Sequence, residues 1–350
     1  DQYLIADLQD HNMEDAAALR KKICRKINEF IVSEQYKSIF TVSVGAIDAR
    51  FALEGYEECR KKFEFSLKCA KKMGKNSFYS FQQEDYNVFL RREKIIAALR
   101  RSIAERYEGF DVYYQPIMDC ASETMVGAEA LMRFTMNTEE GMEVISPMEF
   151  IPLLEETGLI IPAGRFILKK AAKMCCEILQ FIPDFQMNIN VSYVQITQGS
   201  VEDDIIEVIK KYALDPASIC IEMTESGFID MTIPFIRFRH KLESNRIHFV
   251  IDDFGTGYSN LHCISDMNPD YIKIDRDFTA KAMDGQRDYE LFKNIITMIH
   301  SVNARICVEG IEQREWCQKM KKMGADLLQG YFYGKPCKKS DFITNYVRGN

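Results

Sequence analysis

Two adjacent carboxylates stand at the end of an apolar run in residues 251–260, which read IDDFGTGYSN. A buried strand seldom ends on neighbouring negative charges, because burial disfavours the charged form of a carboxyl group. Asp252 or Asp253 alone would be explained as the cap of a following helix. As a pair they suit two cations, with one carboxylate bridging both ions and the other binding the second.

Polar side chains also follow other apolar segments of the chain. Each has an ordinary explanation by itself, such as a helix cap, a closed turn or an ion pair. If the segments are parallel strands, however, these side chains crowd together on one face and the carboxylates repel each other. Bound cations would relieve that repulsion. The residues are Glu129, Asn190, Glu222, Glu225, Asp252, Asp253, Lys273, Asp275, Glu309 and Gln329.

The ligand types indicate which cations fit. The candidate ligands are carboxylate or amide oxygens, and the five histidines fall outside these positions. Such a set suits Mg²⁺, Mn²⁺ or Ca²⁺ rather than zinc. Two close ions with acidic ligands suit phosphoester cleavage, since they activate water and hold the reacting oxygens in line. Lys273 would fix the attacking water or stabilise charge on the phosphorane; a lysine general base is the alternative.

Alternating strand and helix patterns follow residue 107 and predict the scaffold for these residues. Eight strand candidates are separated mostly by helical stretches over about 240 residues, which predicts a (β/α)₈ TIM-like barrel. An open doubly wound sheet is the second possibility. The strand candidates are DVYYQPIMD, TMVGAEALMRF, FQMNINVS, ICIEMTE, HFVIDDF, YIKID, RICVEGI and LLQGYFYG.

The first 85 residues form a separate pattern. Strands YLIADLQ, FTVSVGAID and SFYSF alternate with two amphipathic helices, which predicts a small, incomplete α/β unit. An apolar stripe including Ile95, Ile96 and Leu99 then predicts a linker helix. We therefore expect a domain at 1–85, a linker helix at 86–106 and a second domain at 107–350. The arginines of the linker read as a solvated helix face rather than a nucleic-acid patch.

Composition narrows the functional class. The 350 residues are 47% hydrophobic and 28% charged, with a net charge of −7, as in an ordinary globular protein that does not bind nucleic-acid polymers. No apolar run is long enough to cross a bilayer, and the first residues lack a signal-peptide layout. The 11 cysteines have no zinc-clamp spacing and predict reduced, mostly buried thiols in a cytoplasmic protein.

From residue 107 onward the sequence resembles the EAL family, which hydrolyses the bacterial second messenger cyclic di-GMP to linear pGpG. The namesake triplet stands at Glu129, Ala130 and Leu131. The match covers nearly all of residues 107–350, in the family's order. Its other segments are YYQPI, SPMEFIPLLEETGLI, NINVS, IEMTES, DDFGTGYSNL, DYIKID, VEGIE and LLQGYFYGKP.

The resemblance implies a barrel with one strand reversed and two Mg²⁺ or Mn²⁺ ions per active site. It implies that Lys273 and Gln329 act with the metal ligands Glu129 and Glu309 in catalysis. The implied ligands of the first ion are Glu129, Asn190, Glu222 and Asp252, and those of the second are Asp252, Asp253 and Glu309.

Three further roles are implied by the same resemblance. Gln115 and Arg133 would contact the substrate, cyclic di-GMP, with Arg133 as a phosphate donor. Glu225 would anchor the DDFGTGYSN loop, which in this family couples dimerisation to metal binding. A homodimer through the barrel is therefore expected.

Departures from the family pattern are mild. MRF replaces the usual arginine-tryptophan ending after the triplet, with Arg133 kept; Asn260 stands where serine is usual and Cys307 where alanine is usual. None removes an expected ligand, so we expect an active cyclic-guanylate-specific phosphodiesterase. The alternatives are a non-catalytic cyclic di-GMP receptor and a phosphodiesterase for another nucleotide.

The first segment resembles the C-terminal part of a GGDEF domain, the diguanylate cyclase fold. DQYLIADL aligns from the aspartate of the signature, and TVSVGA and AKKMGKNSFYSF match later segments. Gln2 stands where the signature has a metal-binding glutamate, and Tyr3 where it has phenylalanine. We therefore expect a degenerate, partial domain without cyclase activity that acts by packing.

Overall fold

The computed structural model describes residues 13–33, 42–52, 55–74, 76–224, 232–255, 264 and 267–348. The chain divides into two compact units, 1–94 and 95–350, and the division falls inside helix α3 (Gln83–Ala104). Each unit is described by itself. No helix among the described residues is long and apolar enough to cross a membrane.

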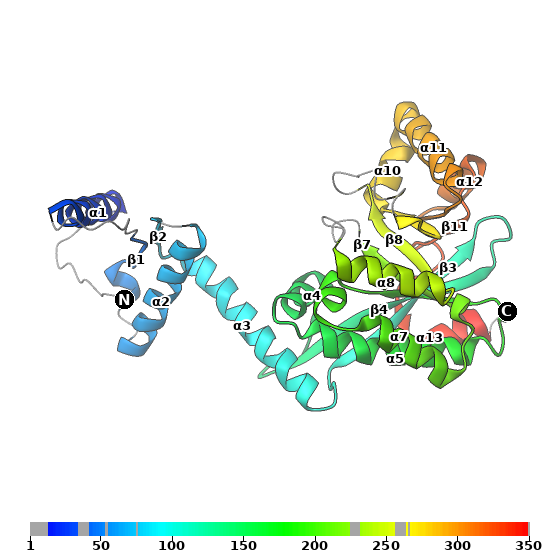
Figure 1. The fold of residues 1–350 in the computed structure, drawn as a ribbon, viewed down its shortest axis with the longest axis horizontal. Helices are drawn as coiled ribbons and strands as arrows, with labels where there is room; N and C mark the ends of the chain where they lie inside the picture. The colour runs from blue at the N-terminus through cyan, green and yellow to red at the C-terminus, as the bar shows by residue number, and fades with distance from the viewer. Residues whose placement is uncertain are drawn as a thin grey trace. The chain divides into compact units, whose positions relative to one another are not determined.

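Ahead of α3, the described residues of the first unit form two α-helices, one short 3-10 helix and two short parallel strands (Figure 1). Its core is aromatic: the rings of Phe65, Phe81 and Tyr86 lie 5.2 to 6.2 Å apart. The two predicted helices are confirmed, whereas the predicted strand YLIADLQ falls outside the described residues. The elements are α1 (Met13–Ser33), β1 (Val44–Ala46), η1 (Ala49–Ala52), α2 (Tyr56–Lys72) and β2 (Phe78–Ser80).

The second unit is a closed barrel. Its ring runs β3-β11-β10-β9-β8-β7-β6-β4 and closes through the β3–β4 pairing. β3 is antiparallel to both neighbours, and the other neighbouring strands of the ring are parallel, so the reversed strand is β3. The strands are β3 (Phe110–Asp119), β4 (Met125–Thr138), β6 (Gln186–Asn190), β7 (Ile219–Thr224), β8 (His248–Phe254), β9 (Tyr271–Ile274), β10 (Arg305–Val308) and β11 (Leu327–Leu328).

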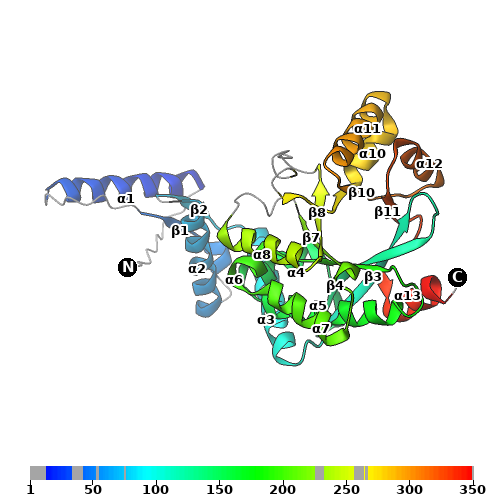
Figure 2. The ribbon, with the colours of Figure 1, turned by 45° about the vertical axis from the view of Figure 1, so that its right-hand side comes forward.

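Helices cover the outside of the ring, as Figures 1 and 2 show for α5, α7 and α8 on one flank and α10 to α12 on another. β5 (Gly141–Ile145) and β12 (Cys337–Lys338) extend the sheet beyond the ring and were not predicted from the sequence. The helices are α4 (Pro147–Glu156), α5 (Ile160–Ile178), α6 (Tyr193–Gln198), α7 (Val201–Tyr212), η2 (Pro216–Ser218), α8 (Ile233–Ser244), α10 (Arg276–Asp284), α11 (Gln286–Ser301), α12 (Arg314–Met323), α13 (Lys339–Phe342) and η4 (Ile343–Val347).

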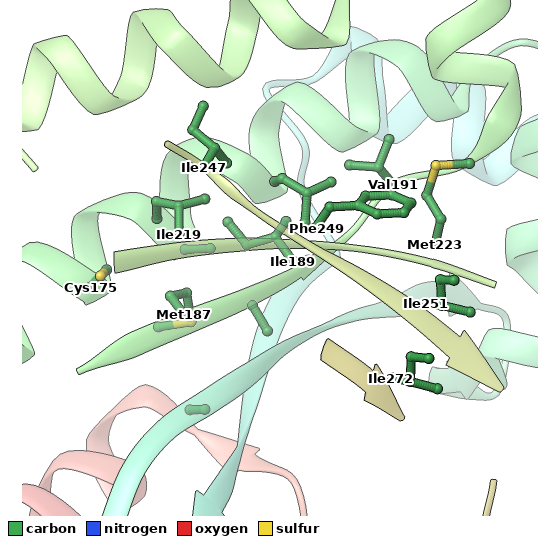
Figure 3. Close-up of a cluster of buried hydrophobic side chains, with 14 of the residues drawn as sticks. Cys175, Met187, Ile189, Val191, Ile219, Met223, Ile247, Phe249, Ile251 and Ile272 are labelled. Atoms are coloured by element: carbon green, nitrogen blue, oxygen red, sulfur yellow. The ribbon is translucent and has the colours of Figure 1, made fainter. Parts of the chain in front are cut away.

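Successive side chains of each strand point alternately outward, toward the covering helices, and inward, into the barrel. Met187, Ile189 and Ile251 point outward into the apolar layer under the helices (Figure 3). The residues between them point inward. One end of the interior, toward the starts of the parallel strands, is filled by a second apolar cluster. It includes Ile117, Cys220, Val250, Tyr271, Cys307 and Leu327. Beyond this cluster, toward the C-terminal ends of the parallel strands, the inward-facing side chains are polar.

Candidate active site

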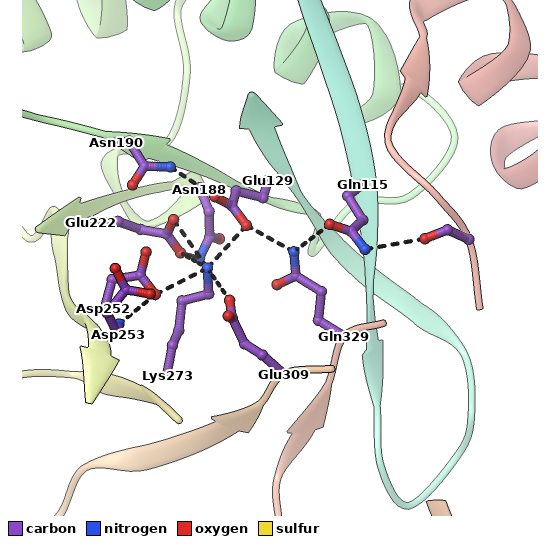
Figure 4. Close-up of polar contacts among 11 residues, drawn as sticks. Gln115, Glu129, Asn188, Asn190, Glu222, Asp252, Asp253, Lys273, Glu309 and Gln329 are labelled. Atoms are coloured by element: carbon purple, nitrogen blue, oxygen red, sulfur yellow. Dashed lines mark hydrogen bonds and ion pairs between the residues drawn. The ribbon is translucent and has the colours of Figure 1, made fainter. Parts of the chain in front are cut away.

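Lys273 on β9 is the centre of the polar end of the barrel (Figure 4). Its side chain is 1% exposed, and its ammonium nitrogen lies close to carboxylates from four other strands or strand ends. The distances from Nζ are 2.9 Å to Glu129, 3.2 Å to Glu222, 3.4 Å to Asp252 and 2.6 Å to Glu309. A buried lysine with these neighbours stays charged and partly offsets their negative charge.

Two amides on β6 reach the neighbouring strands on either side. The Asn190 amide donates to Glu129 Oε1 on β4 at 2.7 Å, and the Asn188 amide donates to Glu222 Oε1 on β7 at 2.6 Å. β6 ends at Asn190 because Ser192 caps helix α6, in a capping box with Gln195. Asn188 was not identified as a site residue from the sequence. Its only indication there is that it stands two residues before Asn190, on the same face of the strand.

A second chain of amides fixes Glu129 from the other side. Gln329 Nε2 donates to Glu129 Oε2 at 2.7 Å and to Gln115 Oε1 at 3.1 Å. Gln115, opposite Glu129 on the reversed strand, donates in turn to the carbonyl of Gly334 at 3.1 Å. These bonds set the orientation of the Gln329 amide, whose buried Oε1 has no hydrogen-bond partner among the described residues.

The pair Asp252–Asp253 lies in an irregularity of β8, where the register with β9 shifts between Ile251 and Phe254. Asp253 has a φ of 56°, in the left-handed region, and its backbone N–H donates to Asp252 Oδ1 at 2.9 Å. A regular strand would point adjacent side chains to opposite faces. The bulge and the positive φ instead turn both carboxylates toward the same site, which explains how one strand end presents two acids.

The carboxylates form two groups that share Asp252. In each, one oxygen per residue lies within 4.8 Å of the others; the groups are Glu129, Glu222 and Asp252, and Asp252, Asp253 and Glu309. These all-oxygen sets fit hard divalent cations, and Asn190 adds an amide at the solvent-exposed end of β6. The Gln329 side-chain oxygen, which has no hydrogen-bond partner among the described residues, could accept a hydrogen bond from a water molecule near Glu129.

Burial and neighbouring charges shift the pKa values of the carboxyl groups in the site. The pKa of Asp253 is raised to about 6 by burial and by Asp252, and that of Glu309 to about 8 by burial, which outweighs Lys273. Burial likewise raises the pKa of Glu222 well above its ordinary value. For Glu129, burial also acts upward, but Lys273 and the amide donors hold its pKa below the ordinary value. These side chains by themselves thus disfavour full ionisation of the four acids.

The expected substrate contact Arg133 has no hydrogen bond or ion pair with the carboxylates of this network among the described residues. The Arg133 guanidinium lies over the Tyr113 ring at 5.4 Å and donates to the Met132 carbonyl at 2.9 Å. It stands four residues beyond Glu129 on β4, and the alternation of a strand places both residues on the same face. Glu225 and most of the expected loop after Asp253 fall outside the described residues.

Comparisons with known proteins identify the family of the chain. The family model described as "EAL domain" matches residues 96–336. The chain is 29% identical over 286 residues to the "Cyclic di-GMP phosphodiesterase PdeL" of Escherichia coli (strain K12), covering 81% of this chain and 76% of that protein. It is 30% identical over 331 residues to the "Signaling protein YkoW" of Bacillus subtilis (strain 168), covering 94% of this chain and 40% of that protein.

A solved structure described as "PaMucR Phosphodiesterase, c-di-GMP complex" matches with a TM-score of 0.64 at 27% identity, covering 71% of this chain and 99% of that one. Another, "Structure of EAL Enzyme Bd1971 - cAMP and cyclic-di-GMP bound form", matches with a TM-score of 0.68 at 27% identity, covering 85% of this chain and 77% of that one. The chain spans about two fifths of the length of the first curated relatives.

Proposed function

The chain belongs to the EAL domain family, and from that premise we propose that it hydrolyses cyclic di-GMP to linear pGpG. Water adds across one of the two phosphodiester bonds of the cyclic dinucleotide, which opens the ring and leaves a terminal phosphate. The observation that carries the proposal is the pair of carboxylate groups sharing Asp252 around the buried Lys273. Relatives named cyclic di-GMP phosphodiesterases support it.

We propose two Mg²⁺ or Mn²⁺ ions as cofactors. Glu129, Asn190, Glu222 and Asp252 would hold one, and Asp252, Asp253 and Glu309 would hold the other. When bound, such ions lower the pKa of a coordinated water and neutralise charge on the phosphate.

The side chains around the carboxylates have their own roles. The Lys273 ammonium, held by four carboxylates, would orient the attacking water and stabilise the charge that develops on the phosphoryl oxygens. Gln329, fixed by Glu129 and Gln115, would accept a hydrogen bond from that water through its Oε1. Arg133 would hold a phosphate oxygen of the substrate.

Gln115 has a less direct part in the proposed site. Its side-chain oxygen accepts from Gln329 and its amide donates to Gly334. We therefore assign it first to positioning Gln329, with the substrate contact expected from the sequence as a further proposal.

We propose that the active form is a homodimer through the barrel, with Glu225 as the anchor of the loop after Asp253. Activity per chain would then fall on dilution below the dimer dissociation constant. A monomer by light scattering, at concentrations that give full activity, would overturn this part.

For the first unit we propose a degenerate, partial GGDEF-like domain that contributes by packing. The relative described as "Bifunctional diguanylate cyclase/cyclic di-GMP phosphodiesterase MucR" of Pseudomonas aeruginosa aligns over 95% of this chain, so the alignment enters this unit. Gln2 brings no negative charge where the signature has an acid. Incubation of a Glu129→Ala chain with GTP and Mg²⁺ should give no cyclic di-GMP by mass spectrometry.

The principal experiment is incubation of the chain with cyclic di-GMP and either Mg²⁺ or Mn²⁺, followed by chromatography of the products. We expect linear pGpG, and no product after treatment with a chelator. Tight binding of cyclic di-GMP without turnover in either metal would reject hydrolysis in favour of a non-catalytic receptor. Turnover of other cyclic dinucleotides at equal rates would reject the proposed substrate preference.

A further inference from the structure

Strand β6 lies between β4 and β7, and its two inward asparagines serve different neighbours. Asn190 donates to Glu129 on β4, and Asn188 donates to Glu222 on β7. Figure 4 shows Asn188 beside Lys273 and Glu222, and Asn188 is buried whereas Asn190 is exposed. Asn188 is 8% exposed and Glu222 is fully buried, so this bond lies in the closed interior.

We propose that Asn188 is a positioning residue for the first metal site, a role that rests on the function proposed above. Its amide fixes one oxygen of Glu222 and so sets the plane of that carboxylate. Glu222 then presents its oxygens to a cation together with those of Glu129 and Asp252.

Glu222 has few other groups to hold it in place. In the described part of the chain, its side-chain polar contacts are with Asn188 at 2.6 Å and with Lys273 at 3.2 and 3.3 Å. Lys273 is shared with three further carboxylates, and its contacts with Glu222 are longer. The short bond from Asn188 is therefore the contact that distinguishes one Glu222 oxygen from the other.

Hydrogen-bond donors behind a metal ligand have measurable effects. They orient the ligand, and their removal typically lowers metal affinity or activity by about 10- to 100-fold. A donor that merely satisfied a buried carboxylate would affect folding stability but would leave the affinity of the folded protein for a cation unchanged. Metal affinity therefore separates positioning from simple burial.

The same strand provides a matched control. Gln186 also lies on the inward face of β6, two residues before Asn188, but its side chain accepts from the Tyr271 hydroxyl at 3.0 Å and donates to the Ala217 carbonyl at 3.4 Å. It has no contact with the carboxylates of the site among the described residues. Gln186→Leu and Asn188→Leu thus remove one amide each from the same face of the same strand.

The experiment is calorimetric titration of the full chain with Mn²⁺ alone, for wild type, Asn188→Leu and Gln186→Leu, with thermal melting of the same samples. We expect about 10- to 100-fold weaker binding in Asn188→Leu and binding within about twofold of wild type in Gln186→Leu. If Asn188→Leu does not fold, Asn188→Ala replaces it, because a smaller side chain leaves room for water.

The outcomes separate the inference from the function on which it rests. Wild-type affinity in the Asn188 variant, or equal losses in both variants, overturns the positioning role while leaving the proposed hydrolysis intact. Failure of the wild-type chain to bind Mn²⁺ overturns both. Weaker binding confined to Asn188 supports the inference even before any turnover is measured.

Discussion

The ammonium nitrogen of Lys273 lies 2.6 Å from Glu309 Oε1, its shortest contact with a carboxylate of the site. Glu309 directly follows β10, the strand that pairs with β9. Since Glu309 belongs to one carboxylate group and Glu129 and Glu222 to the other, Lys273 contacts both. A lysine in this place holds the acids together before any cation arrives. Its charge also opposes the cations that the acids would bind.

Replacing Lys273 with methionine should separate these two effects. Removing one partner of a buried ion pair leaves uncompensated charge, so the metal-free protein should lose about 3 kcal/mol of unfolding free energy. Mn²⁺ should bind at least as tightly as in wild type, because the competing positive charge is gone. Turnover should fall about 10²- to 10³-fold. Chemical denaturation with and without Mn²⁺, alongside product chromatography, would measure all three; weaker Mn²⁺ binding would contradict the assigned position of Lys273.

Glu129→Ala should abolish hydrolysis and leave the fold intact. The Glu129 carboxylate accepts hydrogen bonds from Lys273, Gln329 and Asn190. Its loss would therefore remove one proposed metal ligand and leave these three donors without that acceptor. The control is Glu140→Ala, at an exposed position between β4 and β5. Retained turnover in Glu129→Ala, with unchanged melting, would show that the ligand assignment is wrong.

The affinity for Mn²⁺ should rise with pH between about 6 and 8. In the metal-free site the pKa is about 6 for Asp253 and about 8 for Glu309, so both bind protons at pH values where ordinary carboxyl groups do not. A cation must displace those protons, and its apparent affinity therefore increases as pH rises through these values. Calorimetry in buffers of different ionisation enthalpy should detect proton release at pH 7; a flat affinity profile would count against the assignment of these two ligands.

Asp270 should stabilise the barrel in a pH-dependent way. Burial raises its pKa, but the bonds from His248 and from the Phe249 backbone N–H outweigh that effect and hold the pKa below the ordinary value. Because the folded pKa is depressed, the stabilisation is present above the ordinary pKa of about 4 and is lost as pH falls through the folded value. Asp270→Asn should cost about 1 kcal/mol at pH 7, since Asp270 is partly exposed, and less at pH 3. Equal losses at both pH values, measured by urea unfolding, would contradict the charge-dependent role.

The sequence was most informative where chemistry and strand order coincide. Acids at the ends of predicted strands, such as Asp252 and Glu309, indicated a common face because parallel strands of a barrel end together. The bulge at Asp253 could not be predicted in this way, since its φ of 56° depends on the pairing of β8 with β9. β11 was also hard to define, because only two of its residues pair as a strand.

Side chains with ordinary polarity were the most difficult to assign. Asn188 precedes the expected ligand Asn190 by two residues, and its residue type does not indicate to which neighbouring strand its amide donates a hydrogen bond. That assignment requires knowing that β6 lies between β4 and β7. Arg133 shows the opposite case: its type and position suggested a phosphate contact, and the ring of Tyr113, over which it lies, could not be identified from the sequence.

The reversal of β3 also decides where the chain enters the barrel. In a ring of wholly parallel strands the first strand would begin at the end remote from the carboxylates. Here β3 begins at Phe110, opposite Phe134 and beyond Glu129 on β4, so it begins at the rim that carries the chemistry. Ile95, Ile96 and Leu99 of α3 pack into the same apolar cluster as Phe110 and Phe134. The C-terminal part of α3 therefore packs at the rim of the barrel that carries the proposed active site, and not at the end that the apolar cluster around Val250 fills.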